Sequence, residues 1–305
     1  MPLPWRYRLA QPVNTTVKWV SAQFIFVFMK LLRLVPFKTA SRFMERFARW
    51  LGPKLKRHNI AMDNLAIAFP EKSIEEREKI ASDSWAQMAQ TLLEYFYLDQ
   101  VFDMDAKTGE SERIEFTNAD QYEKLRDDGL PAILFTGHLA NFELLPLVAD
   151  RFGLKLLSMF RQPNNPYAAK RVAQARNVIS ENLVASGDGA SFQLMSALER
   201  GDHVGVLVDQ KFRRGIMVPF FGKAAPSNPL LAKLARRYKC PVHGARTVRL
   251  PNGRFRLEIT EELDLPRDEN GDVDIRGTTE LVNRIVEDWV REYPEQWLWI
   301  HRRWG

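Results

Sequence analysis

A histidine and a glutamate five positions apart have the residue types and spacing of an acid–base pair. His138 follows the short apolar run 132–135, which predicts a buried strand, and a helical pattern begins at Asn141. His138 is therefore expected where a strand has ended and a helix has not begun, a position at which α/β folds place chemistry. Glu143 falls in the first turn of that helix. An imidazole backed by a carboxylate is a general base suited to deprotonating a hydroxyl that attacks an activated acyl group.

A second pair with the same spacing, His58 and Asp63, indicates that the spacing alone is not specific. With five histidines and 38 acidic residues in the chain, such matches arise by chance. His58 follows a basic run at 54–57 and leads into a helical surface with no strand before it. We interpret His58 as structural or surface-exposed, and His138 as the candidate base.

Two further predicted strands end in polar residues that could converge with His138. Arg161 follows one of them and is a candidate for binding a phosphate or a developing oxyanion, with a surface arginine as the alternative. Asp209 follows the other; an acid in this position organises a site or takes part in it, although it could also fix a loop. The residues expected to bind substrate or an oxyanion are Arg161, Asn141, Asp209 and Gln210.

The nonpolar segment 215–222 follows the strand that delivers Asp209. It contains the aromatic residues Phe220 and Phe221 and the small residues Gly215 and Gly222. Such a segment could line an apolar tunnel beside His138 or form the edge of a sheet. We predict that it lines a tunnel for an acyl chain.

The remaining periodicity predicts alternating helices and strands. Strands are expected at 132–135, 154–159, 203–208, 242–249 and 255–259, the last two joined by a hairpin at Pro251-Asn252-Gly253. Helices are expected at 141–152, 165–177, 190–200, 229–238 and 276–293, and the Ser73–Glu76 capping box starts another that runs to about residue 97. The order predicts an α/β fold with a mixed central sheet flanked by helices.

Length and cysteine content limit the class of protein. A chain of 305 residues without a linker or internal repeat after about residue 60 fits one large domain preceded by helices. We therefore expect N-terminal membrane-associating helices over 1–58 and a catalytic domain over 59–305. The single cysteine, Cys240, excludes an internal disulfide and suits a reducing compartment.

The N-terminus carries most of the excess positive charge. Residues 1–57 hold 12 Lys and Arg against one acid, Glu45, and include the charge-free apolar run 19–29. Eleven residues are about half of the ~20 that a membrane-spanning helix needs. In the next expected helix, 39–51, aromatic residues lie beneath a basic face, a pattern typical of a helix in the headgroup layer of an anionic membrane. A helix packed on its own domain is the alternative, and no nucleic-acid-binding motif is present.

Six separated motifs, in order, resemble one known family. They are Asn64-Leu65 with Ala68-Phe69-Pro70-Glu71-Lys72; Thr136-Gly137-His138 with Asn141 and Glu143; Arg161 with Asn164-Asn165; Asp209-Gln210; Val218-Pro219-Phe220-Phe221-Gly222; and Glu295-Gln296-Trp297-x-Trp299-x-His301-Arg302-Arg303-Trp304. Over about residues 20–304 the chain is similar to the late acyltransferases of lipid A biosynthesis, the lauroyl and myristoyl transferases of Gram-negative bacteria.

The resemblance implies transfer of a fatty acyl chain from acyl-carrier protein to a hydroxyl of a lipid A precursor, at the cytoplasmic face of the inner membrane. The protein would be monotopic or held by a single N-terminal anchor. Glycerolipid acyltransferases share the implied fold but usually carry Asp at the fifth position after the histidine, with Phe-Pro-Glu-Gly-Thr-Arg downstream. Here Phe69-Pro70-Glu71 precedes the histidine and lacks Gly-Thr-Arg, which disfavours a glycerophosphate acceptor.

The chemistry expected of these residues needs no cofactor and no metal. A thioester is already activated, so no nucleophilic Ser or Cys is required, and the chain lacks a Gly-x-Ser-x-Gly elbow. His138 would deprotonate a hydroxyl on a 3-hydroxyacyl chain, Glu143 would stabilise the imidazolium, and Arg161 or N–H groups near Asn141 would bind the oxyanion. The alternatives are an acyl-thioester hydrolase, an acyltransferase for another glycolipid or glycerolipid acceptor, and a membrane-binding protein without enzymatic activity.

Overall fold

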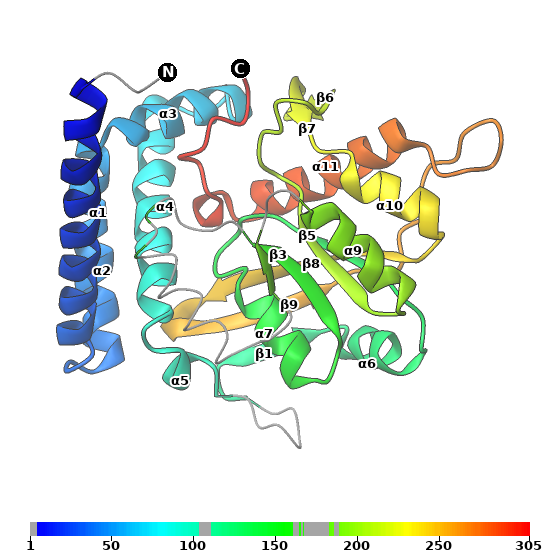
Figure 1. Ribbon diagram of the computed structural model, residues 1–305, viewed down its shortest axis with the longest axis horizontal. Coiled ribbons are helices and arrows are strands. Elements are labelled where there is room, and N and C mark those ends of the chain that lie inside the picture. Colours follow the sequence, from blue (N-terminus) through cyan, green and yellow to red (C-terminus); the bar gives the residue numbers. More distant parts are fainter. Residues whose placement is uncertain (1–4, 104–110, 161–164, 166, 168–182, 186–188) are drawn as a thin grey trace.

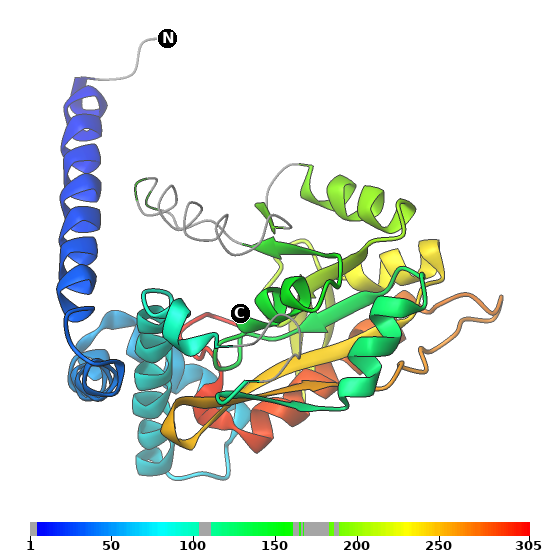
Figure 2. The same cartoon turned by 90° about the horizontal axis from the view of Figure 1, so that it is seen from below.

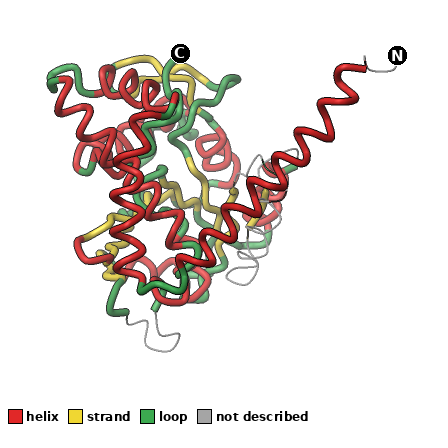
Figure 3. The backbone as a smooth tube through the Cα atoms, turned by 90° about the vertical axis from the view of Figure 1, so that its left-hand side faces the viewer, coloured by secondary structure: helices red, strands yellow, loops and turns green. Residues whose placement is uncertain are grey.

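A computed structural model describes residues 5–103, 111–160, 165, 167, 183–185 and 189–305. The N-terminal part is helical and lies along one side of the molecule (Figure 1). Its elements are α1 (Trp5–Leu32), α2 (Phe37–Leu51), η1 (Gly52–Lys54), α3 (Lys56–Ala68), α4 (Ile74–Glu94) and α5 (Leu98–Val101). Figures 2 and 3 show the N-terminal end of α1 extending away from the rest of the molecule.

A seven-stranded mixed sheet forms the centre of the fold, in the order β1-β9-β8-β2-β5-β3-β4. The strands are β1 (Ile114–Thr117), β2 (Ile133–Thr136), β3 (Leu156–Phe160), β4 (Leu183–Ala185), β5 (His203–Leu207), β8 (Val242–Leu250) and β9 (Arg254–Ile259). All neighbouring pairs are parallel except the β8–β9 hairpin. A separate antiparallel pair is formed by β6 (Ile216–Phe220) and β7 (Lys223–Ser227).

Helices cover both faces of the sheet because alternate side chains of each strand point to opposite faces. Ile133 and Phe135 pack with α9 (Ala190–Glu199), α10 (Leu230–Tyr238) and α11 (Ile275–Glu292). Leu134 faces the other way, into a core that includes α6 (Ala119–Asp127) and α7 (Leu144–Arg151). Two short turns, η2 (Pro251–Gly253) and η3 (Pro294–Gln296), complete the described elements.

The predicted α/β class, the mixed sheet and all five expected strands are confirmed, with strand ends shifted by at most two residues. The Ser73–Glu76 capping box is present at the start of α4, with both of its reciprocal hydrogen bonds. The expected helix at 165–177 lies almost entirely outside the described residues. The strands β1, β4, β6 and β7 were not anticipated from the sequence.

The helix α2 buries a narrow stripe and exposes three of its four aromatic residues. The buried residues are Phe37, Ala40, Met44 and Ala48. Phe43, Phe47 and Trp50 are exposed and form a row with ring centroids about 6 Å apart, in which the Phe43 and Phe47 rings are stacked and the Trp50 ring is tilted. In the described part of the chain, no helix has the length and apolarity needed to cross a bilayer. The expected boundary between residues 58 and 59 falls inside α3.

Candidate active site

Two adjacent parallel strands bring His138 and Asp209 together at their carboxyl ends. Thr136 at the end of β2 is in register with Leu207 at the end of β5, and each polar residue follows its strand by two positions. Imidazole Nδ1 of His138 lies 2.7 Å from Asp209 Oδ1, and the His138 peptide N–H donates to Asp209 Oδ2 at 2.7 Å. The edge of the sheet where these strands end is the usual site of ligand binding in open α/β folds.

Asp209 is completely enclosed and held ionised. Burial by itself raises the pKa of this carboxyl, but the charge and hydrogen bonds of His138 and a hydrogen bond from Trp297 hold the pKa down at about 2. The indole N–H of Trp297 donates to Asp209 Oδ2 at 2.7 Å. An ionised carboxylate only accepts hydrogen bonds, so His138 Nδ1 must carry a proton, which leaves Nε2 as the basic nitrogen when the ring is neutral.

His138 lines two cavities. The larger is apolar, holds about 900 Å³ of empty space that is partly open to solvent, and runs between α7 and the sheet. It is lined near His138 by Phe142 and Glu143, and elsewhere mainly by aliphatic residues such as Leu134, Leu145, Leu156 and Ala149. The smaller has about 210 Å³ of empty space and is lined by His138, Asp209, Gln210, Lys211, Trp297, Leu298, His301 and Arg303.

The loop that follows His138 has an uncommon backbone conformation fixed from two sides. Ala140 has a φ of 45°, in the left-handed region that non-glycine residues seldom adopt. Its N–H donates to the carbonyl of Gln296 at 2.8 Å, and its own carbonyl accepts from the Thr91 hydroxyl at 3.1 Å. The C-terminal segment and α4 therefore hold the loop from opposite directions.

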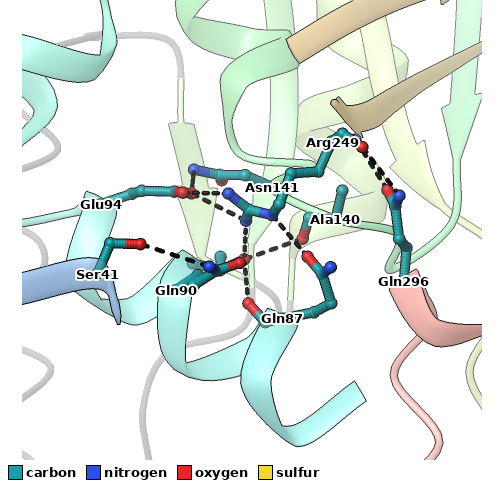
Figure 4. A network of polar contacts seen from close by, with 9 residues as sticks. Ser41, Gln87, Gln90, Glu94, Ala140, Asn141, Arg249 and Gln296 are labelled. Carbon is teal, nitrogen blue, oxygen red and sulfur yellow. Dashed lines mark hydrogen bonds and ion pairs between the residues drawn. The ribbon is translucent and has the colours of Figure 1, made fainter. Parts of the chain in front are cut away.

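A buried ion pair supports the same loop (Figure 4). Glu94 on α4 pairs with the guanidinium of Arg249, and the side-chain amide of Asn141 donates to Glu94 Oε2 at 2.9 Å. Arg249 also donates to Gln87 Oε1 at 2.6 Å, and its peptide group exchanges two hydrogen bonds with the Gln296 side chain, at 2.8 and 3.0 Å. The Asn141 amide thus anchors the loop between His138 and Glu143.

The predicted site residues are only partly brought together. His138, Asp209 and Gln210 meet, and Glu143 lines the same apolar cavity as His138. The carboxylate on Nδ1 is Asp209, whereas the spacing had suggested Glu143 for that role. Arg161 lies outside the described residues.

The four residues expected to line a tunnel lie elsewhere. Phe220 and Phe221 pack with Trp297, Trp299 and Trp304 in the core on the opposite face of the sheet from the apolar cavity. As far as the chain is described, neither Gly215 nor Gly222 contributes to the lining of that cavity. The reason is that residues 216–227 form the separate β6–β7 hairpin instead of extending the central sheet.

Sequence reasoning did not assign functions to Trp297, Glu94 or Arg249. Trp297 belongs to the C-terminal tryptophan-rich motif, and a tryptophan among several polar residues is a signal for a buried hydrogen-bond donor. Glu94 and Arg249 carry no such signal, because a charged residue near the end of a helix or strand is normally solvated.

Comparisons with known proteins identify the family of this chain. The family described as bacterial lipid A biosynthesis acyltransferase matches residues 9–305. A lipid A biosynthesis acyltransferase of Haemophilus influenzae is 24% identical over 282 residues, covering 90% of this chain and 84% of the relative. The palmitoleoyltransferase and lauroyltransferase of lipid A biosynthesis in Escherichia coli are 27% and 26% identical, covering 85% and 87% of this chain and 82% and 81% of their own lengths. With its match over almost the whole sequence, the chain belongs to the family of bacterial lipid A biosynthesis acyltransferases.

Proposed function

We propose that this acyltransferase moves a fatty acyl chain from an acyl-carrier-protein thioester to the hydroxyl of a 3-hydroxyacyl chain on a lipid A precursor. One observation carries the proposal: His138, with Nδ1 fixed by Asp209, lines both the large apolar cavity and a small pocket bordered by Lys211 and His301. An acyl chain fits the first environment, and a sugar-linked acceptor fits the second.

His138 acts as the general base of this transfer. Its Nε2 takes the proton of the acceptor hydroxyl while the hydroxyl oxygen attacks the thioester carbonyl carbon. The carbon–sulfur bond then breaks, and the leaving thiolate takes the proton back from the imidazolium. The Asp209 carboxylate holds the tautomer needed for the first step and stabilises the imidazolium formed in it, the role that the sequence analysis gave to Glu143.

The apolar cavity binds the acyl chain. Its lining of mainly aliphatic side chains suits a hydrocarbon chain. Glu143 lies at the same end as His138, so a thioester carbonyl near His138 would leave the hydrocarbon beneath α7. Burial of the chain there contributes about 0.8 kcal/mol per methylene.

The acceptor approaches through the smaller pocket. Lys211, His301 and Arg303 contribute to its lining and give it a basic character. Arg303 is almost completely buried; burial, partly offset by the nearby Asp209, lowers its pKa to about 10, still far above neutral pH. Its guanidinium donates to the Pro226 carbonyl and the Ser227 hydroxyl, so the half-buried Lys211 is the cation that suits an acceptor whose sugars carry phosphates.

The exposed aromatic row of α2 attaches the protein to an anionic membrane surface, where the lipid acceptor resides. Phe43, Phe47 and Trp50 share the outer side of the helix with the exposed residues Arg42 and Arg46. Aromatic side chains beside arginines are suited to insertion at the headgroup level. Arg49 is less suited to this role, because it pairs with Glu45 and Asp83.

The transfer itself is tested with purified components. Wild-type protein and His138→Ala are incubated with an acyl-carrier-protein thioester and a lipid A precursor, and the products are identified by mass spectrometry. We expect one added acyl chain with the wild-type protein and at least a ~10²-fold slower reaction with His138→Ala. Consumption of thioester without an acylated lipid would instead favour the hydrolase alternative.

Membrane attachment is tested by vesicle flotation. We expect Phe43→Ser combined with Trp50→Ser to reduce binding to anionic vesicles, and Arg42→Glu combined with Arg46→Glu to weaken it most at low salt. Phe192→Ser is the matched control, because Phe192 is 68% exposed on α9, far along the chain from α2. Equal losses in the control and the α2 variants would contradict a specific membrane surface.

A further inference from the structure

The basic nitrogen of His138 is already occupied. Since Nδ1–H is committed to Asp209, Nε2 can only accept a hydrogen bond, and the side-chain amide of Gln210 lies 3.0 Å from it. The Gln210 amide group is therefore placed to donate to the lone pair that must receive the acceptor proton. Gln210 directly follows Asp209 in the chain, so the hydrogen bond between Asp209 and the His138 ring also fixes the position of the Gln210 backbone.

Gln210 stands on the side from which the acceptor must come. It lines the smaller pocket together with Lys211 and His301, whereas the apolar cavity is lined by other residues of the described chain. His138 lines both. With the acyl chain in the apolar cavity, an incoming hydroxyl reaches Nε2 by displacing the Gln210 amide.

We propose that Gln210 is a specificity-determining residue that favours a hydroxylated lipid acceptor over water by occupying Nε2 until the acceptor displaces it. The inference rests on the proposed function of His138 as general base. Transfer and hydrolysis use the same base and the same thioester. In each, an O–H proton passes to Nε2, the oxygen bonds to the acyl carbon, and the carbon–sulfur bond breaks with return of the proton to the thiolate.

The two reactions differ in what can remove the amide from Nε2. A lipid acceptor has sugar, phosphate and acyl groups that bind elsewhere on the enzyme, and this remote binding energy can offset the lost hydrogen bond. A water molecule has no such additional contacts. The Gln210 amide therefore slows hydrolysis more than it slows transfer.

The proposal is tested by the ratio of hydrolysis to transfer. Full-length Gln210→Ala and Gln210→Met are compared with the wild type, measuring thiol release from an acyl-carrier-protein thioester without acceptor and acyl-lipid formation at saturating acceptor. Neither replacement donates a hydrogen bond, and Met also retains the side-chain volume. We expect the ratio to rise about 10-fold in both variants, the scale of one net hydrogen bond. Gln193→Ala, an exposed position on α9, serves as the control and should keep the wild-type ratio.

An unchanged or lowered ratio in Gln210→Met would overturn the proposal, whatever Gln210→Ala does, because Met keeps the packing and removes only the donor. His138→Ala separates this failure from failure of the proposed function. If His138→Ala loses both reactions while the Gln210 ratio is unchanged, only the role of Gln210 is wrong. If His138→Ala retains both reactions, the base assignment itself is wrong.

Discussion

Two histidines in this chain each lie beside a carboxylate and a tryptophan indole, and the two clusters differ in where the ring nitrogens point. One cluster comprises His138, Asp209 and Trp297; the other comprises His58, Glu78 and Trp85. In the second, Nε2 lies 2.9 Å from Glu78 and Nδ1 accepts from the Trp85 indole at 3.3 Å. Both nitrogens of His58 are bonded, as are those of His138, but within the described chain only His138 lines the two cavities, which supports the interpretation of His58 as structural.

The acids differ as well. The Asp209 side chain is 1% exposed, whereas that of Glu78 is 44% exposed. Water screens the exposed carboxylate, so Glu78 holds its histidine only weakly, while Asp209 fixes both the tautomer and the backbone N–H of His138. A carboxylate beside an imidazole is therefore not enough for catalysis. The second ring nitrogen must also face a cavity.

The largest expected effect comes from replacing the two histidines separately. His138→Ala should lower acyl transfer by ~10²–10⁴-fold, because it removes the base, and should also lower the free energy of unfolding, because the buried Asp209 carboxylate loses its ring partner. His58→Ala should lower the free energy of unfolding by about 1–3 kcal/mol, because it leaves buried hydrogen-bonding groups unpaired, and should keep most of the activity. Initial rates and thermal unfolding of both variants test this difference between the two histidines. Equal losses of activity would contradict the assignment of His138 alone as the base.

Local patterns identified each strand end but not which strand ends are neighbours. His138 and Asp209 were both anticipated because each follows an apolar run. Their direct contact was not, because it spans 71 residues and depends on β2 and β5 being adjacent in the sheet. Glu143 was assigned to the imidazole because it is near in sequence, and helix spacing gives no information on partners across a sheet.

Packing on the two faces of the sheet was harder to anticipate. The segment ending in Phe220 and Phe221 was placed beside His138 because it follows Asp209 in the chain. It turns back as the β6–β7 hairpin, which puts both rings in the tryptophan-rich core on the far face. The pair Glu94–Arg249 could not be inferred at all, because 155 residues separate its members and each alone looks solvated.

The supporting network gives the second prediction. His58 lies within the regular helix α3, whereas the His138 loop depends on the buried Glu94–Arg249 pair. Arg249→Met should reduce the free energy of unfolding by about 3–5 kcal/mol, because it leaves a buried carboxylate without its partner. Glu94→Leu combined with Arg249→Met should recover part of that stability but not the activity, because Asn141 would lose its acceptor. Urea unfolding and transfer assays on the same samples separate the two effects.

The third prediction compares the two acids near His138. Asp209→Asn should lower transfer by ~10²-fold, because an amide no longer holds Nδ1–H or stabilises the imidazolium. Glu143→Gln should lower the transfer rate by a smaller factor, because its side chain only lines the cavity and Nδ1 of His138 is already bound to Asp209. The reverse order of losses would return the stabilising role to Glu143.

The same aspartate gives a pH dependence of known sign. The folded-state pKa of Asp209, about 2, lies below its ordinary value of 3.8. Its stabilising contribution is therefore complete above about pH 4 and is lost as the pH falls through about 2. As the pH falls through this window, the midpoint temperature of thermal unfolding should fall more steeply for the wild type than for Asp209→Asn. Parallel curves would contradict the paired, ionised state.

The smallest expected effect concerns acyl-chain selectivity, which depends on the depth of the cavity beside His138. Ala149 lines this cavity and lies six residues beyond Glu143 along α7, about 9 Å further from the His138 end. Ala149→Leu should fill the deep part and shorten the preferred acyl chain by about two carbons. Selectivity between neighbouring lengths should change several-fold, because each methylene contributes about 0.8 kcal/mol. The measurement is transfer from a series of acyl-carrier-protein thioesters of increasing length.

Overpacking alone could also lower activity, so a matched control is needed on the opposite face of the sheet. Ala197 is equally buried, on α9, and belongs to the other core. Ala197→Leu should destabilise the protein by about 1–3 kcal/mol and lower the rates for all donors alike. Gly215→Leu is unsuitable as a probe, because a Cβ at that position would lie 2.1 Å from the carbonyl oxygen of Ser227. A shift toward shorter donors in Ala149→Leu alone identifies the cavity under α7 as the acyl site, and a uniform loss in both variants would exclude it.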